Sequence, residues 1–129
     1  ADVFVGVSRE NLVTAEDIKL MGERAVVFAL ANPIPEIMPQ EAKMGGAFIV
    51  GTGRSDFPNQ INNSLAFPGV FKGALSVKAL MITEEMKIAA ANALAKLVKH
   101  PTVDKVIPGA FDKGVTDAVC DSVAKAYKA

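Results

Sequence analysis

The chain has 129 residues, of which 50% are hydrophobic and 22% are charged, and this composition predicts a folded domain with one core rather than a disordered segment. Its 14 basic and 14 acidic residues are interspersed and give a formal net charge of +0, which argues against the basic stripe of a nucleic-acid-binding protein. No apolar run approaches the roughly 18 residues that a membrane span needs.

Three short apolar runs predict β-strands. They cover residues 3–7, 25–30 and 47–50 and read VFVGV, AVVFAL and AFIV. Runs of this length that are rich in valine, isoleucine and phenylalanine are typical of buried strands. The first run indicates a strand that is buried on both faces, as in a parallel sheet.

Two short helices are expected between these strands. The first begins after Thr14, which suits an N-cap and precedes two acidic residues, and Gly22 is its expected end. The second covers residues 39–44, because Pro39 suits a first helical turn and Gly45 suits a helix end. Strands that alternate with short helices predict a βαβαβ unit with parallel strands.

The predicted fold class is therefore α/β, with about three parallel strands that form part of a Rossmann-like doubly wound sheet, followed by C-terminal helices. Three strands are too few for a complete sheet of this kind. The chain also begins directly at a strand, without Met. We therefore expect it to be part of a longer polypeptide that supplies the other half of the sheet.

The second half of the chain has helical patterns. Apolar residues recur with helical spacing over 65–75, where Pro68 and Gly69 are expected to bend or interrupt the helix. A stronger amphipathic helix begins at Thr83, and a last helix covers about 116–128.

Neutral amides gather directly after the third predicted strand. Four of them fall within five positions: Asn59, Gln60, Asn62 and Asn63. Asn32 follows the second predicted strand and precedes a proline. The carboxyl ends of parallel strands line the ligand crevice of an open sheet, where amides can both donate to and accept from a polar ligand. The alternative is that these amides form Asx-turns or cap the next helix. Asn59 and Gln60 are expected to be local scaffolding.

Other candidate residues favour structural roles. Gly51 and Gly53 begin a dinucleotide fingerprint, but position 56 is Asp instead of the third glycine, so they indicate a tight turn with close backbone approach. Arg54 and Asp56 are expected to pair with each other. Cys120 is expected to be buried, and the chain's one histidine, His100, has no accompanying metal ligands at suitable spacing.

Five segments together resemble the C-terminal part of the nucleotide-binding domain of malic enzymes, most closely the smaller bacterial and archaeal kind. The segments are RSDFPNQINN at 54–63, FPGVFKGAL at 67–75, ADVFVGVS at 1–8, FALANPIPEIMP at 28–39 and IPGAFDK at 107–113. They cover nearly the whole chain in order, and the motifs are long. The resemblance implies that the chain is the C-terminal half of an NAD(P)-binding domain, over residues 1–129.

The resemblance also implies an activity and a division of roles. Malic enzymes oxidise and decarboxylate malate to pyruvate and CO₂ with NAD or NADP, and they use Mg²⁺ or Mn²⁺. It assigns cofactor binding to Asn32 and Asn62 and malate binding to Asn32, Asn62 and Asn63. It places the catalytic lysine and tyrosine, the metal ligands and the glycine-rich phosphate loop upstream of the matched part. No residue of this chain is therefore expected to be catalytic or to bind a metal.

Two alternatives stay open from the residues. The chain could be a non-catalytic nucleotide-binding or regulatory module, or the cofactor half of another 2-hydroxy-acid or amino-acid dehydrogenase. A single cysteine fits a reducing cytoplasm. By resemblance, the other partners are the rest of the same protein and further copies of it in a homo-oligomer. The choice between NAD and NADP depends on residues outside this sequence.

Overall fold

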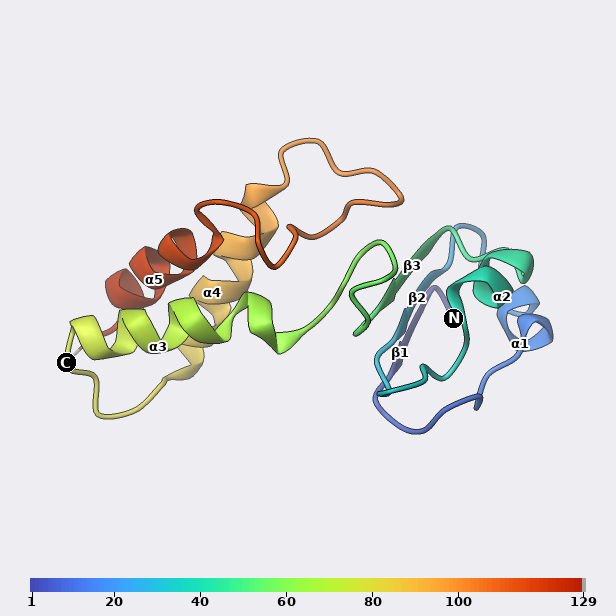
Figure 1. Ribbon diagram of the computed structural model, residues 1–129, viewed down its shortest axis with the longest axis horizontal. Helices are drawn as coiled ribbons and strands as arrows, with labels where there is room; N and C mark the ends of the chain where they lie inside the picture. The colour runs from blue at the N-terminus through green and yellow to red at the C-terminus, as the bar shows by residue number, and fades with distance from the viewer. Residues whose placement is uncertain (129) are drawn as a thin grey trace. The chain divides into compact units, whose positions relative to one another are not determined.

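The computed structural model describes residues 1–128, which divide into two compact units (Figure 1). The first unit comprises residues 1–62 and 102–105, and the second comprises residues 63–101 and 106–128. Each unit has its own cluster of buried hydrophobic residues. The expected single core is therefore replaced by two smaller ones.

The first unit contains the three expected strands in one parallel sheet. β1 (Val3–Gly6), β2 (Val26–Ala29) and β3 (Ile49–Thr52) are neighbours in this order. Their register aligns Phe4 with Val27 and Val27 with Val50. The chain order equals the spatial order, so all three carboxyl ends lie at one edge of the sheet.

Both helices of the first unit cover the same face of this sheet, as right-handed crossovers require. α1 (Ala15–Lys19) contributes Ile18 and α2 (Pro39–Met44) contributes Ala42 to a core that includes Val27 and Val50. Thr14 caps α1 as expected, because its hydroxyl accepts from the Asp17 N–H while the Asp17 carboxylate accepts from Thr14. α2 has the predicted bounds, whereas α1 ends before Gly22 is reached.

The opposite face of the sheet has no helix of the first unit packed on it. Val3 is 55% exposed and Val5 is 58% exposed, although the sequence pattern predicted burial on both faces of β1. That prediction is wrong for these two side chains, because α1 and α2 both pack against the face that contains Phe4. In the register, Val26, Phe28 and Ile49 share the open face with them.

The second unit is helical. It consists of the 3₁₀ turn η1 (Asn63–Leu65), α3 (Phe67–Ser76), α4 (Glu84–Leu97) and α5 (Val115–Ala126). Its core includes Met86 from α4 and both Val119 and Val123 from α5, each of which is fully buried. Pro68 lies in the first turn of α3, where its missing N–H costs no hydrogen bond and the helix is not bent. The helical pattern over 65–75 is instead interrupted between η1 and α3, which is the other outcome that the sequence predicted.

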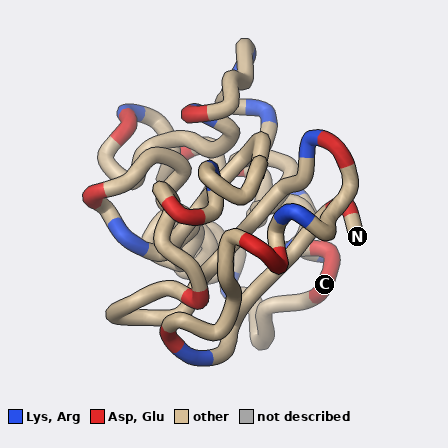
Figure 2. Tube along the Cα trace, turned by 90° about the vertical axis from the view of Figure 1, so that its right-hand side faces the viewer, with Lys and Arg blue, Asp and Glu red and all other residues tan. Residues whose placement is uncertain are grey.

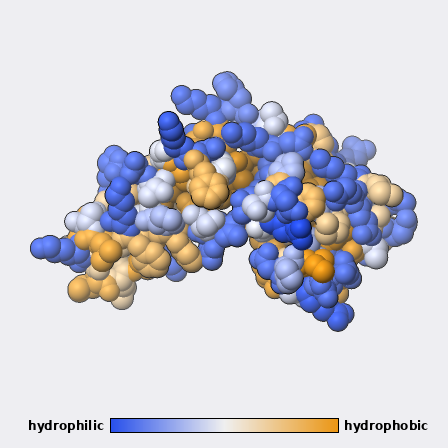
Figure 3. All heavy atoms as spheres, viewed as in Figure 1, coloured by the Kyte–Doolittle hydropathy of each residue, from blue (hydrophilic) through white to orange (hydrophobic). Residues whose placement is uncertain are grey.

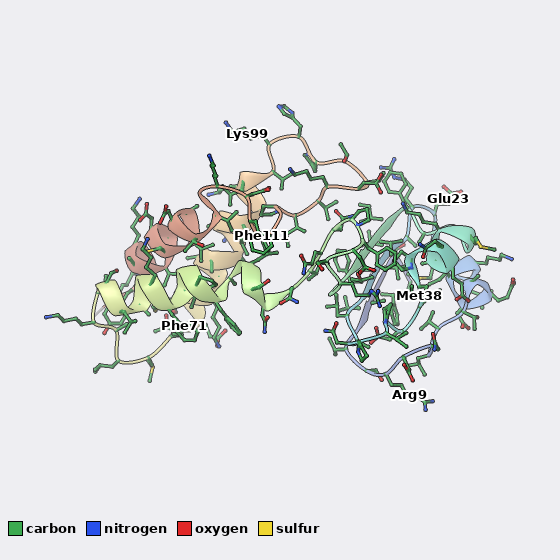
Figure 4. The ribbon with its side chains drawn as sticks, in the orientation of Figure 1. Arg9, Glu23, Met38, Phe71, Lys99 and Phe111 are labelled. Carbon is green, nitrogen blue, oxygen red and sulfur yellow. The ribbon has the colours of Figure 1, made fainter. Side chains whose placement is uncertain are left out.

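α3 and α5 approach each other closely at two glycines of α3. A Cβ atom at Gly69 would lie 2.5 Å from the Val119 Cβ, and one at Gly73 would lie 2.6 Å from the Cys120 carbonyl oxygen. Phe71 extends from the side of α3 that faces away from α5 (Figure 4). The glycines therefore let the two backbones pack without intervening side chains on the α3 side.

The surface carries charges of both signs and a set of exposed apolar side chains. Lys and Arg alternate with Asp and Glu along the trace without a region of one sign (Figure 2). Apolar atoms gather over α3 and the loop that follows it (Figure 3), where several large side chains are exposed: Phe67, Phe71, Leu75, Leu80 and Met81. Among residues 1–128, every helix is too short or too polar to cross a membrane.

Candidate functional site

The candidate site lies at the carboxyl end of the first unit's sheet. Asn32 follows β2 and precedes Pro33, to which it is joined by a cis peptide bond, and its side chain is exposed. After β3 the chain turns back on itself, because Ile61 donates its N–H to the Thr52 carbonyl oxygen at 2.7 Å. This turn brings Asn62 back to the carboxyl end of β3.

Asn32 occupies the space next to Gly53. A Cβ atom at Gly53 would lie 3.1 Å from the Asn32 Nδ2 and 3.2 Å from its Oδ1. The same Nδ2 donates to the Leu30 carbonyl oxygen across 3.4 Å, which is a long hydrogen bond. A side chain at Gly53 would therefore crowd the Asn32 amide, which would have to shift by a few tenths of an ångström.

Asn62 also contacts Gly53, through the glycine carbonyl oxygen. Its Nδ2 donates to the Gly53 carbonyl oxygen at 3.3 Å, and the Gln60 Nε2 approaches that oxygen at 3.5 Å. Asn62 is half-buried, whereas Asn32 is exposed. The structure thus brings together Asn32 and Asn62, two of the three predicted site residues, around Gly53.

Asn63, the third predicted site residue, opens η1 and belongs to the second unit. Its side chain is exposed, and its carbonyl oxygen accepts from the Ala66 N–H at 3.0 Å. α3 has Ala66 as its N-cap without a side-chain hydrogen bond. Neither Asn62 nor Asn63 is therefore the N-cap of α3, so the alternative in which these amides cap the next helix does not hold for α3.

Asn59 has the scaffolding role that the sequence predicted. It is only 6% exposed, and its Nδ2 donates to the Val50 carbonyl oxygen at 3.0 Å and to the Val103 carbonyl oxygen at 2.8 Å. It therefore ties the segment 102–105 to β3. Its backbone is left-handed, with a φ of 54°, a region that asparagine tolerates better than most residues.

Glu36 is the feature of this edge that sequence analysis missed. Its side chain is fully buried, and its two carboxylate oxygens accept from two backbone N–H groups: Oε1 from Ser8 at 2.7 Å and Oε2 from Ala31 at 3.0 Å. A Cβ atom at Gly6 would lie 2.5 Å from the Glu36 carboxyl carbon. An acidic residue between Pro35 and Ile37, in an otherwise apolar connection, was the available signal.

Burial alone would raise the pKa of Glu36, because it penalises the charged form. Backbone hydrogen bonding at Ser8, Ala31, Glu36 itself and Leu30 together outweighs this cost, so the pKa lies below its ordinary value. Glu36 is therefore an ionised, hydrogen-bonded group that links the ends of β1 and β2.

Arg54 and Asp56 form the predicted pair. The Asp56 carboxylate accepts from Arg54 Nε at 2.9 Å and from Nη2 at 2.7 Å, while Arg54 Nη1 donates to the Pro33 carbonyl oxygen at 3.2 Å. The hydrogen bond from Arg54 lowers the pKa of Asp56, and the same bond raises the pKa of Arg54. Because both groups are occupied with each other, this pair is structural rather than an acid/base couple.

The described residues offer no metal-binding cluster. Within 1–128, no three histidine, cysteine, aspartate or glutamate side chains are grouped so that they could hold a metal ion. Cys120 is buried on α5, as predicted, and His100 is exposed. The edge around Gly53 can therefore orient a polar ligand through amide groups, but its residues do not form a nucleophile–base or metal-hydrolysis site.

The second unit has a separate groove of about 340 Å³ between α3 and α4. Its lining is almost entirely apolar and includes Phe67, Phe71 and Leu94, with Lys87 as the only charged side chain. Such a lining suits the burial of apolar groups rather than the orientation of a polar substrate. The candidate site for a polar ligand therefore stays at the edge around Gly53.

Comparison with known proteins places this geometry in a family. The family described as "Malic enzyme, NAD binding domain" matches residues 1–126. Over 128 residues the chain is 57% identical to the bifunctional malic/malolactic enzyme of Bacillus subtilis (strain 168) and 48% identical to the NAD-dependent malic enzyme of Geobacillus stearothermophilus. It is 46% identical over 143 aligned residues to the NADP-dependent malic enzyme of Rhizobium meliloti (strain 1021).

These alignments cover 98% of this chain but only 31%, 27% and 19% of the three relatives. Solved structures agree. The malic enzyme of Pyrococcus horikoshii Ot3 matches with a TM-score of 0.93 and 49% identity, over 97% of this chain and 29% of that one. The Entamoeba histolytica malic enzyme matches with a TM-score of 0.94 and 48% identity, over 97% of this chain and 26% of that one. The chain therefore spans about a third or less of the relatives that it matches.

Proposed function

The chain belongs to the family of malic enzyme NAD-binding domains, and from this premise we propose that it is part of an enzyme that oxidatively decarboxylates malate to pyruvate and CO₂ with NAD or NADP. One observation of the structure supports this most directly. Asn32 and Asn62 both meet Gly53 at the carboxyl end of a parallel sheet, which is where open α/β sheets bind their ligands.

We propose that this chain positions the reactants. Asn32 and Asn62 would hold the nicotinamide part of the cofactor, and Asn32, Asn62 and Asn63 would hold malate. An amide can donate to the malate carboxylates and hydroxyl, and it can both donate to and accept from the nicotinamide carboxamide. It does so without a charge that would disturb hydride transfer.

The nicotinamide cofactor, when bound, supplies the acceptor for the hydride that leaves C2 of malate. The contribution of the asparagines is to keep that carbon and the acceptor in a reactive orientation. Orientation of two bound reactants can lower a barrier by several kcal/mol without any proton transfer by the protein. Lys and Tyr side chains of this chain are given no proton-transfer role.

The remaining parts of the reaction are proposed to come from outside this chain. The residues described here do not fit an Mg²⁺ or Mn²⁺ site, so we propose that ligands for the metal of the complete enzyme lie in the rest of the polypeptide. The catalytic acid and base and the phosphate-binding loop are proposed to lie there as well. In keeping with the family, we further propose a homo-oligomer in the cytoplasm.

The test uses the complete polypeptide that contains this chain. We expect malate-dependent reduction of NAD or NADP, with pyruvate and CO₂ formed in equal amounts. Asn63→Ala is expected to lower kcat/KM about 100-fold, because a positioning contact is lost while the protein stays folded. Asn32→Ala and Asn62→Ala are expected to lower it in the same direction. Steady-state kinetics and circular dichroism give the two measurements.

Asn92→Ala is the matched control, because Asn92 is exposed within α4 and is given no ligand role. It is expected to keep wild-type kinetics. If Asn63→Ala also kept wild-type kinetics, Asn63 would be removed from the site. A complete polypeptide that showed no malate oxidation with either nucleotide would contradict the proposed function itself.

A further inference from the structure

The Asn32–Pro33 turn is held from two directions by charged side chains: Glu36 belongs to the same connecting segment, and Arg54 follows β3. Glu36 reaches the backbone just before Asn32, and Arg54 reaches the backbone just after it. Both side chains contact the main chain of the turn and leave the Asn32 amide to other groups.

Glu36 holds the turn from the interior. Its Oε2 accepts from the N–H of Ala31, the residue that precedes Asn32, while its Oε1 accepts from the N–H of Ser8, which follows β1. The carboxylate therefore fixes the path of the chain after β2 relative to the end of β1. A charge that is fully buried is costly unless it is hydrogen-bonded in this way, so a neutral side chain of the same shape would not replace it equally.

The Glu36 carboxylate occupies the space that a side chain at Gly6 would fill. A Cβ atom at Gly6 would lie 2.5 Å from the Glu36 carboxyl carbon and 2.7 Å from Oε1. No side chain larger than hydrogen fits there while Glu36 stays in place. The end of β1 is thus shaped around Glu36, and Glu36 determines where the turn after β2 begins.

Arg54 holds the turn from the surface. Asp56 accepts from both Nε and Nη2 of Arg54, which fixes the plane of the guanidinium group. The remaining Nη1 then donates to the Pro33 carbonyl oxygen at 3.2 Å. Since Arg54 follows β3 and Pro33 follows β2, this contact ties the ends of two adjacent strands together beside Gly53.

We propose that Glu36 and Arg54 are positioning residues for Asn32. Together they set the backbone of residues 31–33, so that the Asn32 amide is presented beside Gly53 in one orientation. This inference depends on the proposed function, because it assumes that Asn32 binds the reactants. Neither Glu36 nor Arg54 is assigned a contact with them.

The experiment is a set of double-mutant cycles in the complete polypeptide. The variants are Asn32→Ala, Glu36→Gln and Arg54→Gln, together with the two doubles that include Asn32→Ala. Glutamine keeps nearly the shape of Glu36 but has only one oxygen for its two N–H donors. Glu36→Gln and Arg54→Gln are each expected to lower kcat/KM for malate about tenfold, since small misplacements of a positioning group have effects of this size.

The deciding measurement is whether the losses in kcat/KM of the single variants multiply in the double variants. If both residues act through Asn32, each double variant is expected to have the same kcat/KM as Asn32→Ala alone, because the group that they orient is already gone. A general loss of structure would instead lower kcat/KM by a similar factor whether or not Asn32 is present. Arg54→Gln keeps the cycle informative if Glu36→Gln does not fold, because Arg54 lies near the surface and outside the core cluster.

Lys43→Gln is the matched control for loss of an ion pair in the same unit. It breaks the pair of Lys43 Nζ with Asp104 Oδ1 at 3.1 Å, which does not involve residues 31–33. Its kcat/KM is expected to equal that of the wild type.

Two results would overturn the inference in distinguishable ways. If Asn32→Ala lowers kcat/KM but the losses from Glu36→Gln and Arg54→Gln multiply with it in full, the positioning role is wrong and the proposed function stands. If Asn32→Ala itself has no effect, the proposed ligand role of Asn32 fails, and the inference fails with it.

Discussion

Gly53 contributes no side chain, and the Asn32 amide occupies the space that this leaves. Replacing Gly53 with alanine would place a methyl group 3.1 Å from the Asn32 Nδ2, so the amide must move by a few tenths of an ångström or more. Gly53→Ala in the complete enzyme is therefore expected to lower kcat/KM about tenfold through misplacement of that amide. The kinetics should be measured beside Ser55→Ala, an exposed neighbour in the same loop. Equal kcat/KM for the two variants would show that the space at Gly53 does not matter.

Glu36 is expected to make the stability of the first unit depend on pH in the acidic range. Its pKa is lowered in the folded state relative to the ordinary 4.5, so its ionised form contributes stability that is present above pH 4.5 and is lost as the pH falls through the lower folded value. Between neutral pH and pH 3 the wild type is therefore expected to lose more stability than Glu36→Gln, which cannot titrate. Urea denaturation of the complete polypeptide across this range measures the difference. Parallel losses in both proteins would mean that Glu36 does not carry this dependence.

At the residue scale, sequence reasoning found the groups with an exposed or turn-forming signature and missed the buried one. Asn59 was predicted as scaffolding, and its two backbone hydrogen bonds confirm this. Glu36 escaped because a carboxylate in a connecting segment normally faces solvent. Only the spatial proximity of the β1 and β2 ends supplies the N–H donors that make its burial favourable.

Packing between α3 and α5 depends on the two glycines of α3. At Gly73 a Cβ atom would lie 2.6 Å from a backbone oxygen of α5, which cannot move aside independently of its helix. Gly73→Ala is expected to destabilise the protein by about 2 kcal/mol from this overlap, even though alanine favours an isolated helix by about 1 kcal/mol. Chemical denaturation measures the change.

Leu75→Ala is the control for this substitution, because Leu75 lies on the same helix and is 77% exposed. Its free energy of unfolding is expected to stay within about 0.5 kcal/mol of the wild type. A Gly73→Ala protein as stable as this control would contradict the close contact between α3 and α5.

At the element scale, local signals located the helices well where caps are strong. α2 has its predicted bounds because proline opens it and glycine closes it. For α3, the sequence left open whether Pro68 and Gly69 bend the helical pattern over 65–75 or interrupt it, since proline is tolerated in a first helical turn but not in a helix interior. The residues before Pro68 form the separate turn η1, so the pattern is interrupted and Pro68 lies at the start of α3.

At the scale of the whole molecule, the sequence predicted three parallel strands but not the exposure of their side chains. The βαβαβ pattern gives three parallel strands, and the structure has them in that order. Val3 and Val5 have the apolar character of buried residues, yet more than half of each is exposed. Hydrophobic pattern shows which side chains favour burial, but it does not show which segment covers them.

Cofactor affinity is a property of more than this chain. The 129 residues contain no complete glycine-rich phosphate-binding turn, because Asp56 stands where the third glycine would be. The isolated chain is therefore expected to bind NAD and NADP far more weakly than the complete polypeptide, with no micromolar binding in calorimetry. Micromolar binding of NAD to the isolated chain would contradict this expectation.

The position of Cys120 has a practical consequence. Cys120 is the chain's only cysteine and is buried on α5, where its backbone packs closely against Gly73 of α3, so an alkylating reagent is expected to reach its thiol when the helical unit opens. The first unit contains no cysteine. The rate at which the Cys120 thiol is alkylated therefore reports the opening of the helical unit, and no label has to be introduced.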